Sequence, residues 1–84
     1  MNILKLALVD NENNILKEES KFLPSSDSKD FIESLVYLCN KLDISPPVWT
    51  FVQERELNKK NEVIIKDTEY GKNYLKVSIL PNNT

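Results

Sequence analysis

Few side chains in this chain of 84 residues have the chemistry that catalysis usually needs. The sequence contains no histidine, the side chain that most often acts as a general base or metal ligand near neutral pH. Its single thiol, Cys39, falls on the apolar face of a predicted helix, whereas a reactive thiolate needs an exposed, electropositive setting. We therefore expect Cys39 to be a small buried hydrophobic residue and not a nucleophile.

Carboxylates are the remaining candidates for acid–base or metal chemistry. Glu54 and Glu56 would share one face of a strand, but two acids at this spacing are usually a solvated face. Asp10, Glu12 and Asn14 alternate as in a calcium loop, yet the glycine and the distal glutamate of such a loop are missing. With one glycine in the chain there is no phosphate-binding loop. The sequence therefore predicts a protein that is not an enzyme, without a cofactor or a metal site.

A nucleic-acid site could be built on lysines in the second half of the chain. Lys59 and Lys60 occupy a predicted turn, and Lys66 follows nearby. Proteins that bind single strands combine such a basic surface with exposed aromatic rings. Acidic residues interrupt these lysines almost one for one and would cancel most of the field: Glu54, Glu56, Glu62, Asp67 and Glu69. A nucleic-acid-binding regulator is therefore the alternative interpretation.

A protein-interaction surface is the interpretation that the residue types favour. Tryptophan, tyrosine and arginine are the side chains that most often anchor protein interfaces. The second half of the chain concentrates such residues together with a phenylalanine: Trp49, Phe51, Arg55, Tyr70 and Tyr74. A single helix cannot cover all of them. Whether Trp49 and Phe51 complete the core or face a partner stays open from the sequence.

The element that organises the chain is an amphipathic helix predicted over residues 26–42. Asp27 or Ser28 is the expected N-cap, and Pro46-Pro47 prevent the helix from continuing. Its apolar residues recur at helical spacing and form one broad face: Phe31, Ile32, Leu35, Val36, Leu38, Cys39 and Leu42. Because a lone helix of this length is marginal in water, we expect it to pack on a sheet.

Strands are predicted on both sides of this helix. Residues 3–9 are apolar on both faces, as in a central strand, and residues 15–23 have the charged middle of an edge strand. The chain should reverse at 10–14, where Asn residues suit a tight turn. Two further strands are predicted at 62–66 and 74–80, joined by a loop in which Gly71 takes a positive φ.

The segment from Val48 to Leu57 is ambiguous. Pro47 could open a second helix, but residues 48–52 are all strand formers, and we interpret residues 48–57 as a strand followed by a turn at 58–61. The predicted fold is α+β, a two-layer sandwich with one helix on a mostly antiparallel sheet of four or five strands. The expected order is strand, strand, helix and then three strands, in one domain over 1–81 with a disordered tail at 82–84.

The composition indicates the cellular compartment of the protein and the kind of organism it comes from. A single cysteine suits a reducing compartment, and neither a secretory signal nor a membrane-spanning run is evident, so we expect a cytoplasmic protein. Ten lysines to one arginine are typical of A/T-rich coding, as in many bacteria and phages. We expect a small non-enzymatic interaction domain, of the kind found among accessory or inhibitor proteins of phages and mobile elements. Its partner would be another protein or a second copy, bound through a sheet face or edge.

Overall fold

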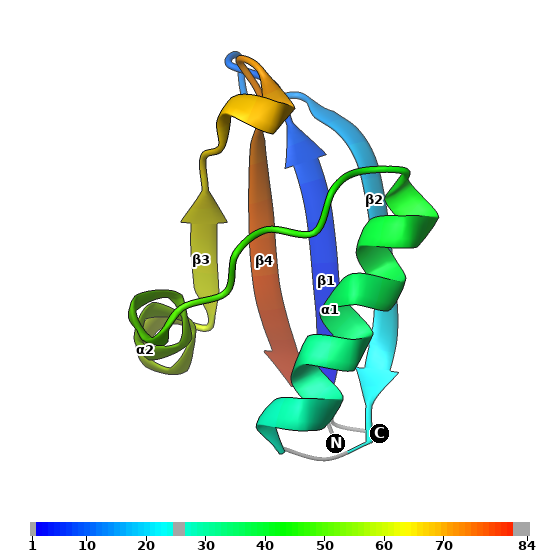
Figure 1. Ribbon diagram of the computed structural model, residues 1–84, viewed down its shortest axis with the longest axis vertical. Helices are drawn as coiled ribbons and strands as arrows, with labels where there is room; N and C mark the ends of the chain where they lie inside the picture. The colour runs from blue at the N-terminus through cyan, green and yellow to red at the C-terminus, as the bar shows by residue number, and fades with distance from the viewer. Residues whose placement is uncertain (1, 25–26, 82–84) are drawn as a thin grey trace.

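The computed structural model describes residues 2–24 and 27–81 and shows an α+β fold with one open antiparallel sheet and two α-helices (Figure 1). This confirms the predicted fold class. The predicted tail at 82–84 lies outside the described residues. The elements in chain order are β1 (Asn2–Val9), β2 (Ile15–Leu23), α1 (Ser28–Leu42), α2 (Phe51–Lys60), β3 (Glu62–Ile65), a 3₁₀ turn (Thr68–Tyr70) and β4 (Tyr74–Pro81).

The sheet has the strand order β2-β1-β4-β3, and every neighbouring pair is antiparallel. β1 is central, as its apolar character on both faces predicts. Leu4 and Leu6 are fully buried on the face that α1 covers, while Ala7 and Val9, at alternate positions, are almost fully buried on the opposite face. β2 forms one edge of the sheet, and its residues 15–20 are all exposed.

The turn between β1 and β2 is fixed by Asp10. Its side-chain oxygen Oδ1 accepts hydrogen bonds from the backbone N–H groups of Glu12 and Asn14, both at 2.8 Å. These bonds favour the ionised carboxylate, and they hold the pKa of Asp10 below its usual value. Asn13 adopts the left-handed conformation with φ 67°, so the predicted reversal at 10–14 is confirmed.

α1 supplies most of the helical contribution to the core. Its N-cap is Asp27, whose side chain accepts from the N–H of Lys29 at 3.0 Å, and it ends where Asp43 turns left-handed with φ 59°. Four residues of the predicted apolar face are buried: Leu35, Leu38, Cys39 and Leu42. Ile32 and Val36, which were expected on the same face, stay more than one-third exposed.

The prediction of a strand over 48–57 is wrong, because residues 51–60 form the helix α2. Thr50 and Gln53 make a capping box, in which the Thr50 N–H donates to Oε1 of Gln53 at 2.9 Å. This local bonding starts a helix although the preceding residues are strand formers. The predicted turn at 58–61 is the last turn of α2, and Asn61 ends it with φ 59°. The sheet of the described residues therefore has four strands and no fifth.

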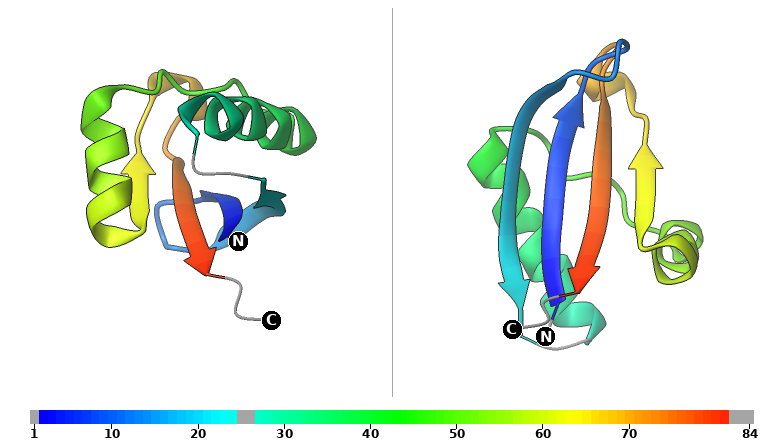
Figure 2. Two further views of the ribbon diagram at one scale, coloured as in Figure 1. Left: turned by 90° about the horizontal axis from the view of Figure 1, so that it is seen from below. Right: turned by 180° about the vertical axis from the view of Figure 1, so that it is seen from behind.

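The two helices take different positions relative to the sheet. α1 lies across one face, next to β1 and β2 (Figure 1). α2 is seen end-on in Figure 1 and side-on in the left view of Figure 2, so it runs through the plane of the sheet beside β3. Neither α1 nor α2, the two α-helices of residues 2–24 and 27–81, lies on the opposite face (Figure 2, right). Neither described helix has the length and apolar character needed to cross a bilayer.

Candidate functional site

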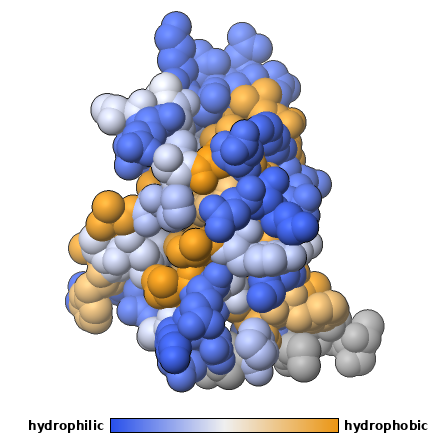
Figure 3. Space-filling model, turned by 45° about the vertical axis from the view of Figure 1, so that its right-hand side comes forward, coloured by the Kyte–Doolittle hydropathy of each residue, from blue (hydrophilic) through white to orange (hydrophobic). Residues whose placement is uncertain are grey.

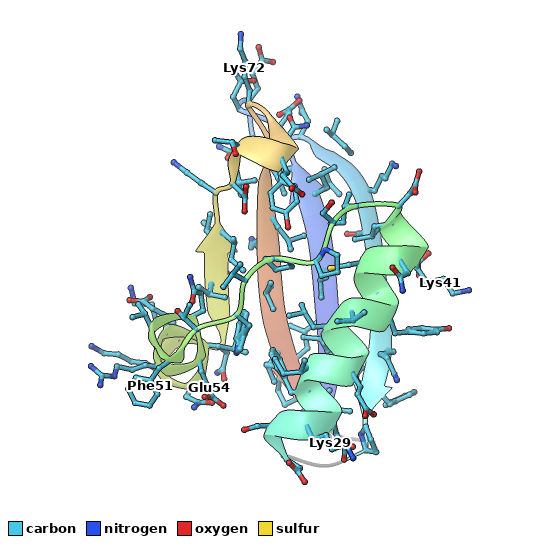
Figure 4. The ribbon with its side chains drawn as sticks, in the orientation of Figure 1. Lys29, Lys41, Phe51, Glu54 and Lys72 are labelled. Atoms are coloured by element: carbon cyan, nitrogen blue, oxygen red, sulfur yellow. The ribbon has the colours of Figure 1, made fainter. Side chains whose placement is uncertain are left out.

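The most exposed large hydrophobic side chains of the described residues gather at the start of α2. Val48 is 76% exposed, Phe51 69% and Val52 67%, and we call these three residues the α2 ridge. Figure 4 shows the Phe51 ring pointing away from the sheet, and in Figure 3 apolar atoms reach the left-hand margin of the molecule, where α2 lies. Grouped apolar side chains of this kind are unusual on a surface that contacts only water.

A cation is held against the ridge. The guanidinium carbon of Arg55 lies 4.9 Å from the centre of the Phe51 ring, within the range of a cation–π interaction. Arg55 follows Phe51 by one helical turn, and Lys59 follows Arg55 by another, so the three side chains share one stripe of α2. The ridge is therefore bordered by positive charge.

Trp49 lies among the ridge residues in sequence but points the other way. Its side chain packs against the core, and its ring centre is 4.9 Å from that of Phe31 on α1. The indole N–H is buried and has no hydrogen-bond partner among the described residues. The structure thus resolves what the sequence left open: Trp49 packs against the core, and Phe51 is on the surface.

The two tyrosines of the predicted surface lie elsewhere. Tyr70 is only 8% exposed, and its hydroxyl donates to the carbonyl oxygen of Ser45 at 2.9 Å. Burial raises the pKa of Tyr70 to about 12. Tyr74 is half-buried, and its hydroxyl donates to Oδ1 of Asn13 at 2.7 Å, beside the β1–β2 turn. Tyr70 therefore belongs to the core, and of the predicted surface residues only Phe51 and Arg55 lie together on the outside.

The lysines of the alternative interpretation do not form one basic surface. Lys59 and Lys60 end α2, and Lys60 pairs with Glu56 at 3.4 Å. Lys66 is exposed just after β3. Lys76 on β4, near the same edge, pairs with Glu62 at 3.6 Å. Acidic partners thus neutralise part of the positive charge, as the alternation in the sequence predicts.

The groups considered for catalysis are separated or buried. Cys39 has no exposed surface, and burial raises the pKa of its thiol to about 11. Because residues 51–60 are helical, Glu54 and Glu56 diverge instead of sharing a face. Glu54 accepts from the Ser28 hydroxyl at 3.2 Å, and Glu56 binds Lys60. Among the described residues, no three histidine, cysteine, aspartate or glutamate side chains gather as metal ligands would.

A groove of about 550 Å³ lies between the start of α1 and α2. The Ser28–Glu54 hydrogen bond joins the two helices there, and Glu54 is the one charged side chain among its lining residues. No basic group is among these residues to attract an anionic ligand. The residues lining the groove are Asn2, Leu23, Pro24, Ser28, Phe31, Glu54, Leu57, Asn58, Asn61 and Ile79.

No known protein family, characterised protein or solved structure matches the chain. A functional assignment therefore rests on the surfaces described above.

Proposed function

We propose that the protein is a small, non-enzymatic binding domain that recognises another protein through the α2 ridge. The observation that carries this proposal is the exposure of Val48, Phe51 and Val52, each about two-thirds or more, around the start of α2. Burying a large apolar side chain in an interface stabilises the complex by about 1.5–3 kcal/mol. Three such side chains are enough for the central contacts of a modest interface.

The border of the ridge indicates the chemistry of the partner. Phe51, Arg55 and Lys59 form one stripe, so an apolar ring lies next to two cations. The complementary surface would carry an apolar anchor flanked by carboxylates. The contact between Arg55 and Phe51 supports the proposal, because it restrains the ring in its exposed orientation before binding and so lowers the entropy lost on association.

A binding role is also supported by the state of the other reactive groups. The Cys39 thiol is buried and protonated at neutral pH, and the carboxylates of Glu54 and Glu56 point in different directions. Neither arrangement provides a nucleophile next to a base. The exposed ridge is thus the most distinctive chemical feature of the described surface.

Affinity capture with matched variants tests this function. The bait is the tagged full chain, compared with the triple variant V48S/F51S/V52S and with the control I15S/L80S, which removes exposed apolar side chains of β2 and β4 outside the ridge. We expect wild type and control to retain at least one protein in similar amounts. The amount retained by the ridge variant should be lower by about tenfold or more, because the loss of one central anchor alone would weaken binding by that factor. The captured protein should then bind purified wild type and not the ridge variant.

Two outcomes would contradict the proposal. Equal capture by all three baits would show that the ridge does not contact a partner. Capture of nucleic acid that is released at about 0.5 M salt, and that is lost in K59S/K60S, would instead support the alternative regulator, because phosphate contacts are strongest at low salt. Circular dichroism of each variant shows whether the fold is preserved.

A further inference from the structure

β2 provides a long free strand edge on the side of the molecule away from α2. It has nine residues, pairs with β1 on one side, and lies at the end of the strand order. An edge strand presents unpaired N–H and C=O groups in a row, which can bond to another strand. The other edge of the sheet is short, since β3 has four residues, and α2 lies against it (Figure 2, left).

The charged middle of β2 is only partly matched within the chain. Glu18 pairs with Lys5 at 3.3 Å, the Lys17 ammonium donates to the carbonyl oxygen of Leu42 at 3.1 Å, and Lys21 lies 5.1 Å from the centre of the Tyr37 ring. Glu19 makes no ion pair or hydrogen bond with any described side chain. The open edge of β2 therefore carries the negative charge of Glu19 two residues before the positive charge of Lys21.

Symmetry limits how β2 can pair with β2 of a second copy. A two-fold axis perpendicular to the sheet makes the two β2 strands antiparallel. It also places one residue of β2 directly opposite the same residue of the second copy. An axis at Lys17, Glu18, Glu19 or Lys21 would put like charges directly opposite, which is unfavourable. Ser20 is the uncharged residue in the middle of the strand. With Ser20 on the axis, Glu19 lies opposite Lys21 of the second copy, and the same pair occurs twice.

We infer that two copies of the chain associate through β2 in this register, so that their sheets join into one antiparallel sheet. Charges on an edge strand usually prevent such pairing, but here their order selects one alignment. The two α1 helices would lie antiparallel on the same face. Tyr37 and Lys41 occupy the flank of α1 above β2, where Figure 4 shows Lys41 pointing outward, and would face the same flank of the second copy.

This inference is independent of the proposed function. The α2 ridge lies beside β3, and β2 is the opposite edge of the sheet (Figure 1). The association of two copies would leave both ridges accessible. The ridge variant should therefore still form the pair, and variants at Glu19 or Lys21 should still bind a ridge partner.

Charge reversal provides the test. Sedimentation and light scattering of the full chain, from about 10 μM to about 1 mM, should show twice the monomer mass in wild type at high concentration. In the E19K pair, lysine faces lysine at both places where position 19 of one copy lies opposite position 21 of the other. In the K21E pair, glutamate faces glutamate at the same two places. Each variant should therefore weaken association about tenfold or more. Mixing E19K with K21E restores both opposite-charge pairs, and so does the double variant E19K/K21E. Both should recover the wild-type dissociation constant.

Three results would overturn the inference. The first is a monomer at every concentration. The second is a dimer that neither single variant weakens, which would place the contact away from β2. The third is a dimer sensitive to E19K but not to K21E, since a register centred on Glu18 would pair Lys17 with Glu19. Circular dichroism of the variants separates loss of pairing from loss of folding.

Discussion

Two weak acids lie in the core close to each other. Cys39 is fully buried on α1, and Tyr70 is nearly so at the end of the 3₁₀ turn. Burial raises the pKa of Cys39 from 9.0 to about 11, and burial together with the charge on Cys39, Asp67 and Glu69 raises that of Tyr70 from 10.0 to about 12. The folded protein therefore holds both protons more tightly than the unfolded chain does.

These shifts predict a loss of stability in alkali. Above pH 9 the unfolded chain loses the Cys39 proton while the folded protein keeps it, so the free energy of unfolding should fall as pH rises from about 9 to about 11. A shift of about two pKa units corresponds to about 3 kcal/mol for Cys39, at about 1.4 kcal/mol per unit, and most of it is lost by pH 11. Urea unfolding between pH 8 and pH 11 measures it. C39A should show a shallower decline than wild type, whereas the control L38A should be less stable at every pH with an unchanged decline.

At the scale of elements, α2 is held to the core by little side-chain surface. Leu57 is its one buried residue, and it belongs to the same core cluster as the α1 and β1 leucines. The remaining attachments are the hydrogen bond that the Ser28 hydroxyl donates to Glu54 and contacts at the two ends of the helix. Trp49 packs against Phe31 before it, and the Asn61 carbonyl accepts from the Ile79 N–H at 2.9 Å after it.

Leu57→Ala should therefore destabilise the protein by about 2–4 kcal/mol, through lost burial and the cavity that remains. Val52→Ala shortens a side chain on the same helix that is 67% exposed, and should change the free energy of unfolding by no more than about 0.5 kcal/mol. Urea denaturation of the two variants makes the comparison. Similar losses in both would show that α2 is attached differently from the arrangement described.

Elements with a clear pattern of apolar and polar residues could be predicted from the sequence, and α2 could not. The face of α1, the double-sided apolar pattern of β1 and the charged middle of β2 each point to one structure. α2 begins with Phe51 and Val52, which favour strands, and has a single buried leucine to mark a helical period. The signal that identifies it is the spacing of Thr50 and Gln53, a capping box. A local hydrogen bond thus outweighed residue propensity.

At the scale of the whole molecule, the burial of side chains and the pairing of strands decrease outward from the middle of the sheet. β1 and β4 are paired on both sides and hold the fully buried Leu4, Leu6, Leu75 and Val77. α2 lies outside the last strand. The exposure of the candidate surface depends on this placement: the sequence identifies Trp49 and Phe51 as aromatic, but only the direction of α2 decides which of them faces water.

Hydrogen exchange should follow the same gradient. We expect the backbone amides of β1 and β4 to exchange at least about tenfold more slowly than those of α2, because opening α2 exposes little buried surface. Mass spectrometry after exchange at neutral pH, with peptides that cover each element, measures the order. Slower exchange in α2 than in β1 would contradict the described layering.

The position of α2 also limits how far the sheet can grow. A sheet with two open edges can add copies at both, and repeated addition gives filaments of the amyloid kind. Among the described strands β3 is short and has α2 against it, so β2 is the one long edge. In the inferred pair each β2 edge is occupied by that of the other copy, so polymerisation would stop at two copies, and removing α2 would expose a second growing end.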